Sequence, residues 1–207
     1  MEDQWLAWAK RLQSIASTGA HFGVDPFDRE RYAEIAGIAN RMLATLGNVP
    51  LERIGGLVTD FAQGYVTPKV DVRGAVIEHD RVLLVRENVD GLWTLPGGWA
   101  DVGLSPSENV VKEIREEAGI RVRATGLYGI RHKAKHAYDP DTRDLYKFFF
   151  LCEKLDDAEP APGTETSAVG FFGIDALPPL SRGRVIERDI AAALAFRGDP
   201  TARVAFD

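Results

Sequence analysis

The chain has 207 residues, of which 45% are hydrophobic, and this suits one large domain or two small ones with enough apolar side chains for a core. Its formal net charge of −6 and pI of about 5.3 argue against broad binding to a nucleic-acid backbone. The single cysteine, Cys152, excludes a disulfide within the chain, and we expect a reducing, cytoplasmic location. We expect no membrane association, because no apolar run approaches spanning length and residues 1–5 lack the features of a signal peptide.

The first 64 residues have the pattern of a small helical domain. Apolar residues recur at helical spacing over residues 5–16, 28–46 and 50–61, and Gly47 is expected to end the second helix. A helical domain of about sixty residues has only a marginal core when it stands alone. We therefore expect it to pack on the rest of the chain or on a second copy, and we favour a homodimer because closed two-fold dimers are the commonest assembly.

From Thr67 onward the pattern changes to strands. Residues 70–77 and 81–86 flank a short turn at His79-Asp80 and predict a β-hairpin. Further strands are expected over residues 93–95, 122–131, 145–152 and 169–174, with a closing helix over 184–196. This order predicts an α/β fold, an α/β/α sandwich with a mixed sheet, over residues 65–207.

The most informative stretch is a glycine loop at Gly97-Gly98 followed by one capped helix. Residues 105–108, Ser-Pro-Ser-Glu, have the form of a capping box, and Gly119 is placed to end the helix in a left-handed conformation. At about 100° per residue, the apolar side chains form one stripe on this helix and the glutamates form a separate edge. The apolar positions are Val110, Val111, Ile114 and Ala118, and the glutamates are Glu113, Glu116 and Glu117.

This carboxylate edge indicates a bound divalent metal. Two like charges ~5 Å apart at an effective dielectric of about 20 repel by about 3 kcal/mol, and a hard cation such as Mg²⁺ reverses the sign of that cost. The alternative is a solvated acidic helix face with Lys112 and Arg115 as salt-bridge partners. The preceding glycine loop and the fixed spacing favour the metal.

The run from Gly98 to Ile120 resembles the Nudix box, whose pattern is Gly, five residues, Glu, seven residues, Arg-Glu, an aliphatic residue, any residue, Glu-Glu, any residue, Gly, aliphatic. The matching positions are Gly98, Glu113, Ile114, Glu116, Glu117, Gly119 and Ile120. Two positions depart, because the first glutamate of the pattern falls on Leu104 and its arginine falls on Lys112. The wider resemblance spans Val66 to Phe196 and implies the Nudix fold.

Four further segments resemble the Nudix subgroup with an added helical N-terminal domain. They are residues 5–12, 27–32, 67–73 and 178–181. That subgroup is associated with nucleoside diphosphates linked to another group, including ADP-ribose and CDP-choline. The resemblance implies divalent-metal-dependent hydrolysis of the pyrophosphate bond, which gives a nucleoside monophosphate and a phosphorylated partner.

The same resemblance implies a metal site for Mg²⁺ or Mn²⁺. Its ligands would be Glu113, Glu116 and Glu117, helped by the carbonyl of Gly97. The general base would come from the box or from a loop elsewhere, and Glu165 is our candidate for a catalytic acid group outside the box. The alternative for Glu165 is an exposed loop glutamate.

Candidates for substrate binding lie outside the helix. A basic, partly aromatic stretch at a strand end supplies Arg131, His132, Lys133, Lys135 and His136. Arg73, in a strand, and Trp99, after the glycine loop, are further candidates. The alternatives are a solvated strand and loop for the basic stretch, core packing for Trp99, and a position away from the pocket for Arg73.

Three functions stay open, and Leu104 in place of the box glutamate is the feature that favours the second. The first is an active pyrophosphohydrolase on a nucleoside diphosphate derivative, which we favour. The second is a catalytically weak or inactive nucleotide-binding or sensing protein, and the third is an RNA 5′-end pyrophosphohydrolase, against which the acidic pI counts. We expect Leu104 to be an apolar plug beside the loop, whose burial contributes ~1.5–3 kcal/mol.

Overall fold

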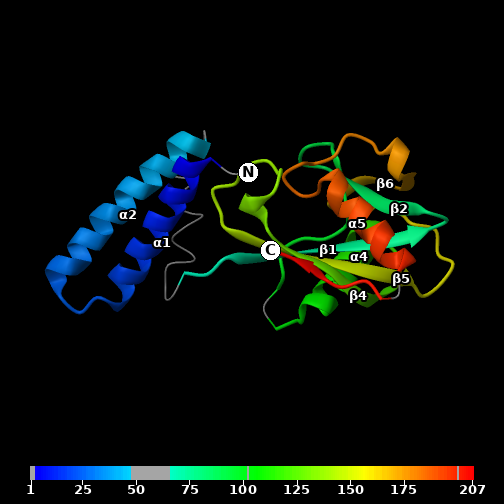
Figure 1. Cartoon of the computed structure of the whole chain (residues 1–207), viewed down its shortest axis with the longest axis horizontal. Coiled ribbons are helices and arrows are strands. Elements are labelled where there is room, and N and C mark those ends of the chain that lie inside the picture. The colour runs from blue at the N-terminus through cyan, green and yellow to red at the C-terminus, as the bar shows by residue number, and fades with distance from the viewer. Residues whose placement is uncertain (1–2, 48–65, 102, 200) are drawn as a thin grey trace. The chain divides into compact units, whose positions relative to one another are not determined.

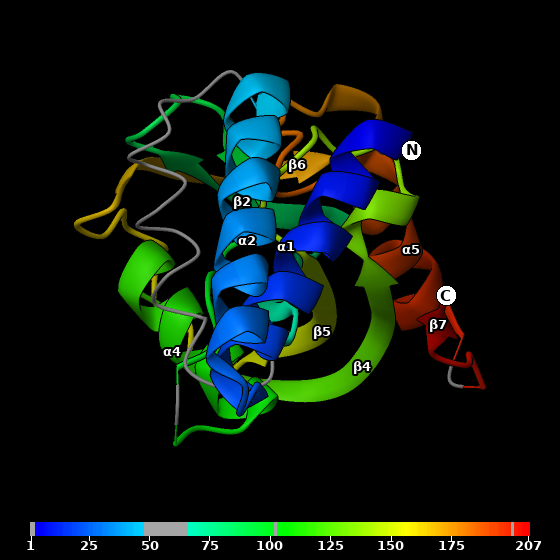
Figure 2. The same cartoon turned by 90° about the vertical axis from the view of Figure 1, so that its left-hand side faces the viewer.

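The computed structural model describes residues 3–47, 66–101, 103–199 and 201–207 (Figures 1 and 2). The chain divides into two compact units, one with residues 1–69 and 134–145 and the other with residues 70–133 and 146–207. The third helix expected over residues 50–61 and the domain boundary expected at Gly64 lie outside the described residues, so both stay predictions. No helix in the described ranges is long and apolar enough to cross a membrane.

The first unit contains a helical hairpin of α1 (Gln4–Phe22) and α2 (Pro26–Gly47), which run antiparallel (Figure 1). The Asp3 carboxylate accepts a hydrogen bond of 2.8 Å from the Trp5 amide and so caps α1. Small side chains let the helices approach closely, since Ala9, Ala16 and Ala39 are buried. The two helices expected over residues 5–16 and 28–46 are therefore confirmed.

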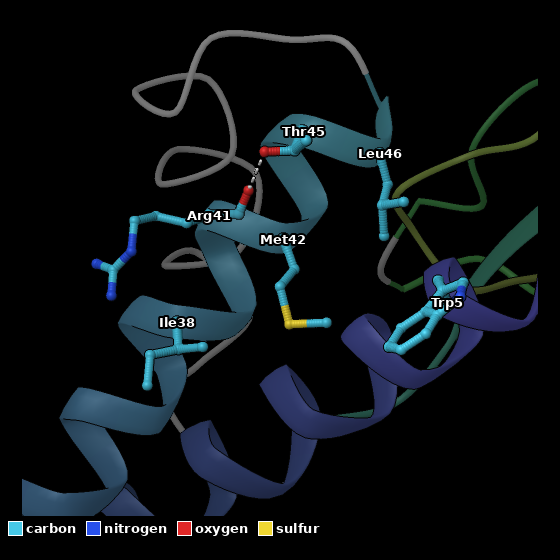
Figure 3. A pocket seen from close by; sticks show the side chains of 6 residues that line it. All are labelled: Trp5, Ile38, Arg41, Met42, Thr45 and Leu46. Atoms are coloured by element: carbon cyan, nitrogen blue, oxygen red, sulfur yellow. Dashed lines mark hydrogen bonds between the residues drawn. The ribbon is translucent and has the colours of Figure 1, made fainter.

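The apolar side chains whose spacing predicts these helices are largely exposed to solvent. Trp5 is 58% exposed and Trp8 is 48% exposed, and several aliphatic side chains of both helices are also exposed. These are Leu12, Ile15, Ile35, Ile38 and Leu46. Trp5 and residues of α2 line a pocket of about 400 Å³ with a mainly apolar wall (Figure 3). The described helices thus carry an apolar face.

The second unit is built on a mixed sheet, which has seven strands in the described part of the chain. The strands are β1 (Lys69–Glu78), β2 (Arg81–Glu87), β3 (Trp93–Thr94), β4 (Val122–His132), β5 (Leu145–Lys154), β6 (Thr166–Gly173) and β7 (Ala205–Phe206). Their order is β3-β2-β1-β5-β4-β7, and β6 pairs with β2 beside this path. The β4/β7 pair is parallel, whereas β1/β2, β2/β3, β2/β6 and β4/β5 are antiparallel.

Strands β1 and β2 form the predicted hairpin. Its turn residues His79 and Asp80 have φ angles of 47° and 57°, as a two-residue turn between twisted strands requires. Strand β4 bends strongly where its register with β5 shifts (Figure 2). The short strand β7 was not expected from the sequence, and the closing helix starts at Glu187 rather than at 184.

Helices α4 (Pro106–Ala118) and α5 (Glu187–Gly198) cover opposite faces of the sheet. The core on the α4 face consists mainly of Val72, Val76, Leu83, Val85, Val110, Ile114, Ala118, Phe150 and Cys152. On the other face, the ring of Tyr128 lies 5.7 Å from Phe149 and 6.2 Å from Phe196 of α5, measured between ring centroids. The predicted α/β/α sandwich with a mixed sheet is confirmed.

Candidate active site

Helix α4 begins and ends where the sequence predicts. The Ser105 hydroxyl accepts a hydrogen bond of 3.2 Å from the Glu108 amide, and the Glu108 carboxylate accepts one of 2.8 Å from the Ser105 amide. Gly119 follows the helix with a φ of 68°, a left-handed conformation. Because the apolar stripe of α4 is buried against the sheet, the rotation of the helix about its axis is fixed.

The glycine loop runs beside β1 and is hydrogen-bonded to its backbone. The Gly74 amide donates to the Pro96 carbonyl and the Val72 amide donates to the Gly98 carbonyl, each at 2.9 Å. Gly97 has a φ of 142°, and a Cβ at this position would lie 2.0 Å from the Val72 carbonyl oxygen. Only glycine fits this close approach.

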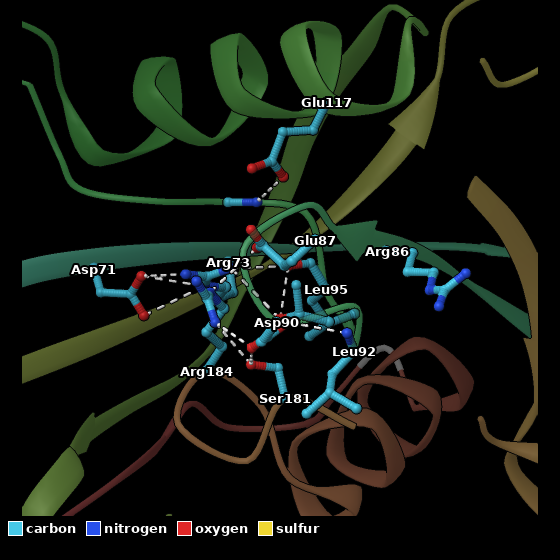
Figure 4. Close-up of polar contacts among 12 residues, drawn as sticks. Asp71, Arg73, Arg86, Glu87, Asp90, Leu92, Leu95, Glu117, Ser181 and Arg184 are labelled. Atoms are coloured by element: carbon cyan, nitrogen blue, oxygen red, sulfur yellow. Dashed lines mark hydrogen bonds and ion pairs between the residues drawn. The ribbon is translucent and has the colours of Figure 1, made fainter. Parts of the chain in front are cut away.

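This loop holds Glu117 directly. The Gly97 amide donates a hydrogen bond of 2.9 Å to Oε2 of Glu117, which is only 5% exposed (Figure 4). Glu113 reaches the next residue of the loop, since its Oε2 lies 3.0 Å from where a Cβ on Gly98 would be. Two of the three box glutamates therefore gather at the glycine loop.

Glu116 is more exposed to solvent than this pair. Its carboxylate lies 3.1 Å from Nζ of Lys112, and its side chain is 48% exposed. The same ammonium group lies 3.1 Å from Asp101 and 3.7 Å from Glu113. Within the described ranges, no group of three or more acidic, histidine or cysteine side chains is arranged to hold a metal ion. Lys112 thus lies between the carboxylates of Glu113 and Glu116, and the metal-binding roles expected for the three glutamates stay predictions.

Burial makes the two inner carboxylates difficult to ionise. It raises the pKa of Glu117 to about 7, although the charge of Arg73 and the Gly97 amide oppose this shift. Burial also raises the pKa of Glu113, against the opposing charge of Lys112. A cation would offset both effects, and carboxylate and carbonyl oxygens are the donors that Mg²⁺ and Mn²⁺ prefer. The donor chemistry at this loop therefore fits such an ion.

The loop before β6 brings Glu165 to the same end of α4. The Gly163 amide and the Thr166 hydroxyl both donate to the Glu117 carbonyl, at 3.2 and 2.8 Å. Glu165 is exposed, and beyond the effect of burial its charge raises the pKa of Glu113. Glu165 therefore lies within electrostatic range of the box, as a catalytic role requires.

Arg73 is buried beneath the loop rather than exposed in a pocket. It is 4% exposed, and its guanidinium donates to the Leu95 carbonyl at 3.1 Å and pairs with the Asp71 carboxylate at 2.8 Å (Figure 4). Asp71 also pairs with the ammonium group of buried Lys147. Burial lowers the pKa of Lys147 to about 8, although Asp71 opposes this shift. We define Asp71, Arg73 and Lys147 as the buried triad.

A second cluster of polar side chains lies next to the buried triad, and no sequence motif predicts it. Arg184 lies 3.2 Å from Glu87 and 2.8 Å from Asp90, and the Ser181 hydroxyl donates to Asp90 at 2.7 Å (Figure 4). Glu87 is buried, and its charge adds to burial in raising the pKa of Glu117. These residues come from distant segments and belong to no motif, so the sequence held no signal that would join them.

The basic stretch at the end of β4 is only partly directed to solvent. Arg131 is 3% exposed, and its Nε lies 3.1 Å from the carboxylate of Asp189 on α5. The His132 amide donates to the Asp207 carboxylate at 2.6 Å, and Lys133 is buried. Arg131 thus forms a buried ion pair between β4 and α5.

The rest of that stretch belongs to the first unit. Lys135 is exposed, and the ring of His136 meets that of Tyr138 edge-on, with centroids 6.2 Å apart. The five basic and aromatic candidates therefore do not form one continuous surface within a single unit. Their roles in substrate binding stay predictions.

Trp99 and Leu104 both lie at the surface beside the loop. Trp99 is 40% exposed and pairs with Asp71 through an isolated β-bridge. Leu104 is 41% exposed and lines a surface hollow of about 550 Å³ between α4 and the start of β4, together with Val111 and Val122. The prediction that Leu104 is a buried plug is wrong, because the turn that carries it faces solvent.

The family of the chain follows from comparison with known domains. The NUDIX domain model matches residues 67–194, more than half of the chain, and the chain therefore belongs to the Nudix family. A second model, described as a UDP-X-like N-terminal oligomerisation domain, matches residues 3–58. Both matches confirm the resemblance seen in the sequence.

Individual relatives agree with this assignment. A Bacillus subtilis (strain 168) protein named "Putative ADP-ribose pyrophosphatase YjhB" is 40% identical over 210 residues, which cover 100% of this chain and 99% of that protein. The crystal structure of an ADP-ribose pyrophosphatase from Streptococcus suis 89-1591 has a TM-score of 0.62 and 44% identity over 68% of this chain and 100% of that chain. The crystal structure of UDP-X diphosphatase has a TM-score of 0.63 and 31% identity over 98% of both chains. The protein is a Nudix pyrophosphohydrolase.

Proposed function

We propose that the protein hydrolyses the pyrophosphate bond of a nucleoside diphosphate linked to another moiety, of the ADP-ribose, CDP-choline or UDP-X type, in a divalent-metal-dependent reaction. The observation that carries this proposal is the gathering of buried Glu117 and partly buried Glu113 at the Gly97-Gly98 loop. The printed names of the relatives, ADP-ribose pyrophosphatase and UDP-X diphosphatase, support the substrate class. The products are a nucleoside monophosphate and a phosphorylated partner.

The cation, Mg²⁺ or Mn²⁺, is assigned to Glu113, Glu117 and the Gly97 carbonyl. Glu116 joins them when its carboxylate leaves Lys112, which holds it at 3.1 Å. When bound, such an ion neutralises phosphate charge and lowers the pKa of a coordinated water. The Gly97 amide orients Glu117 through Oε2, so the direction of the second carboxylate oxygen is also set.

Glu165 is proposed to accept a proton from the attacking water. It lies on an exposed loop that is hydrogen-bonded to the end of α4, and its charge acts on Glu113. Trp99, His132, Lys133, Lys135 and His136 remain candidates for contacts with the phosphates or the terminal group. Arg73 and Arg131 are left out of this set because both guanidinium groups are buried in ion pairs.

The reaction is tested on a single panel of substrates. ADP-ribose, CDP-choline, UDP-sugars, NADH and diadenosine polyphosphates are incubated with Mg²⁺, with Mn²⁺ or with excess EDTA, and the products are identified by mass. We expect cleavage between the phosphates of at least one nucleoside diphosphate derivative, and only with metal present. Undiminished cleavage in EDTA, or no cleavage of any substrate, would contradict the proposal.

A second candidate function is nucleotide binding or sensing with little turnover. It is supported by Leu104 in place of the box glutamate and by the Lys112–Glu116 pair, which keeps one carboxylate near solvent. Calorimetric binding of a nucleotide that is not cleaved would favour it. An RNA 5′-end activity is the third candidate, and competition by 5′-phosphorylated RNA against the preferred small substrate tests it.

We infer that the protein is a homodimer joined through its helical domain, which we assign to residues 1–64, with the hydrolase domain over residues 65–207. The supporting observations are the exposed Trp5 and Trp8 and the pocket between α1 and α2 (Figure 3). The description of the matched N-terminal domain as an oligomerisation domain supports the same inference.

A further inference from the structure

Strand β1 holds the glycine loop through both its backbone and a side chain. The backbone of β1 is hydrogen-bonded to the Pro96 and Gly98 carbonyls. In addition, Nη1 of Arg73 donates to the carbonyl of Leu95, which lies two residues before Gly97. Leu95 is fully buried, so its carbonyl needs donors from the protein, and the Thr94 hydroxyl donates to it at 3.2 Å beside Arg73.

Arg73 is itself fixed by the rest of the buried triad. Its Nε and Nη2 donate to the Asp71 carboxylate at 3.1 and 2.8 Å (Figure 4). Lys147 brings a second buried cation to Asp71 from β5, which neighbours β1 in the sheet. The planar guanidinium can therefore bond Asp71 and Leu95 together, which an ammonium group cannot do with the same geometry.

We propose that Arg73 is a positioning residue for the metal site, because it holds the Leu95 carbonyl and thereby sets the Gly97 amide that orients Glu117. This inference rests on the proposed function. The geometry of the loop is measurable without substrate or metal. The competing roles for Arg73 are direct contact with substrate and a general contribution to stability.

Two substitutions of Arg73 and one matched control separate these roles. Arg73→Lys keeps the charge but loses the forked hydrogen bonding, and Arg73→Met removes both. The control is Lys154→Met, because Lys154 of β5 pairs with Glu78 of β1 at 3.1 Å. This control removes an ion pair between the same two strands, at their other end.

The first measurement is hydrogen exchange of peptides that contain residues 97–100, in metal-free protein. We expect about tenfold faster exchange or more in both Arg73 variants and the wild-type rate in Lys154→Met, since exchange reports the free energy of local opening.

The second measurement is Mn²⁺ affinity, and the third is kcat and KM for the preferred substrate. Mn²⁺ affinity and kcat should fall by about 10- to 100-fold in both Arg73 variants, the usual cost of losing a residue that supports a metal ligand, while KM stays near the wild-type value.

Wild-type exchange in folded Arg73→Met would overturn the proposal. A higher KM with unchanged exchange would assign Arg73 to substrate contact, and an equal loss in Lys154→Met would assign it to general stability. If Arg73→Met does not fold, Arg73→Lys carries the test. If the wild-type protein cleaves no substrate, exchange and Mn²⁺ affinity still decide the positioning role, so its failure is distinct from failure of the proposed function.

Discussion

The amide of Gly97 and the carboxylate of Glu117 are joined by a hydrogen bond of 2.9 Å across 20 residues of sequence. This bond ties the glycine loop to the last turn of α4, so neither element sets the site alone. The Gly97 amide thus stabilises the charged form of the buried Glu117 carboxylate, whereas burial disfavours that form and raises its pKa. The predictions for Glu117 depend on this balance.

Glu117→Gln should reduce kcat by more than about 100-fold, since even the outer partners of metal ligands contribute about 10- to 100-fold. The substitution keeps an acceptor for the Gly97 amide, so the loop geometry survives while the charge for the cation is lost. Glu108→Gln is the control, because it changes an exposed glutamate of the same helix and glutamine also completes a capping box. Steady-state rates with saturating Mg²⁺ test this, and a wild-type rate in Glu117→Gln would contradict it.

The pKa of Glu117 predicts how stability depends on pH without metal. Its pKa rises from 4.5 to about 7 on folding, so the folded state binds this proton more tightly than the unfolded state. The contribution of Glu117 to the free energy of unfolding therefore falls as the pH rises from about 4.5 to about 7, by about 3 kcal/mol at most.

Urea denaturation in EDTA at pH 5 and pH 8 measures this effect. Relative to Glu117→Gln, the wild-type protein should lose stability between the two pH values, and saturating Mg²⁺ should restore it. A constant difference between the two proteins across this range would mean that Glu117 has an ordinary pKa.

Features set by local sequence could be predicted. The capping box at Ser105 and Glu108 and the left-handed Gly119 involve residues within one helix, and the His79-Asp80 turn joins adjacent strands. The glycine loop and its helix were likewise predicted as one motif. In each case the partners are separated by only a few residues or belong to one fixed pattern.

Features that depend on distant segments could not be predicted. The buried triad joins β1 to β5. Glu87 pairs with Arg184, which lies near the other end of the hydrolase domain in the sequence. Helical spacing placed Glu116 beside Glu113 and Glu117, but it could not show that Lys112 would hold this carboxylate near solvent. It also could not show that the turn at Leu104 is exposed.

Leu104→Glu tests whether the missing box glutamate limits activity. Leu104 is 41% exposed, so the substitution should change the free energy of unfolding by no more than about 0.5 kcal/mol. We expect a modest change in kcat or in metal affinity, because Glu113, Glu117 and the Gly97 carbonyl are already at the loop. Leu104→Gln is the uncharged control. A rise of several orders of magnitude from a negligible rate would instead support the inactive, nucleotide-sensing interpretation.

The double substitution Trp5→Glu and Trp8→Glu should convert the protein from dimer to monomer at micromolar concentration. The two indole rings meet edge-on with centroids 5.1 Å apart, and both are about half exposed or more, so they form one apolar patch on α1. A partner helix that covers this patch excludes water, and two carboxylates in such an interface would be unpaired and costly to bury. Multi-angle light scattering measures the mass, and circular dichroism checks that the helices remain.

The control for this double substitution is Val89→Glu, which adds a charge at an 85% exposed valine in the second unit. A wild-type monomer would contradict the homodimer, and a double variant that stays dimeric would place the interface on another face.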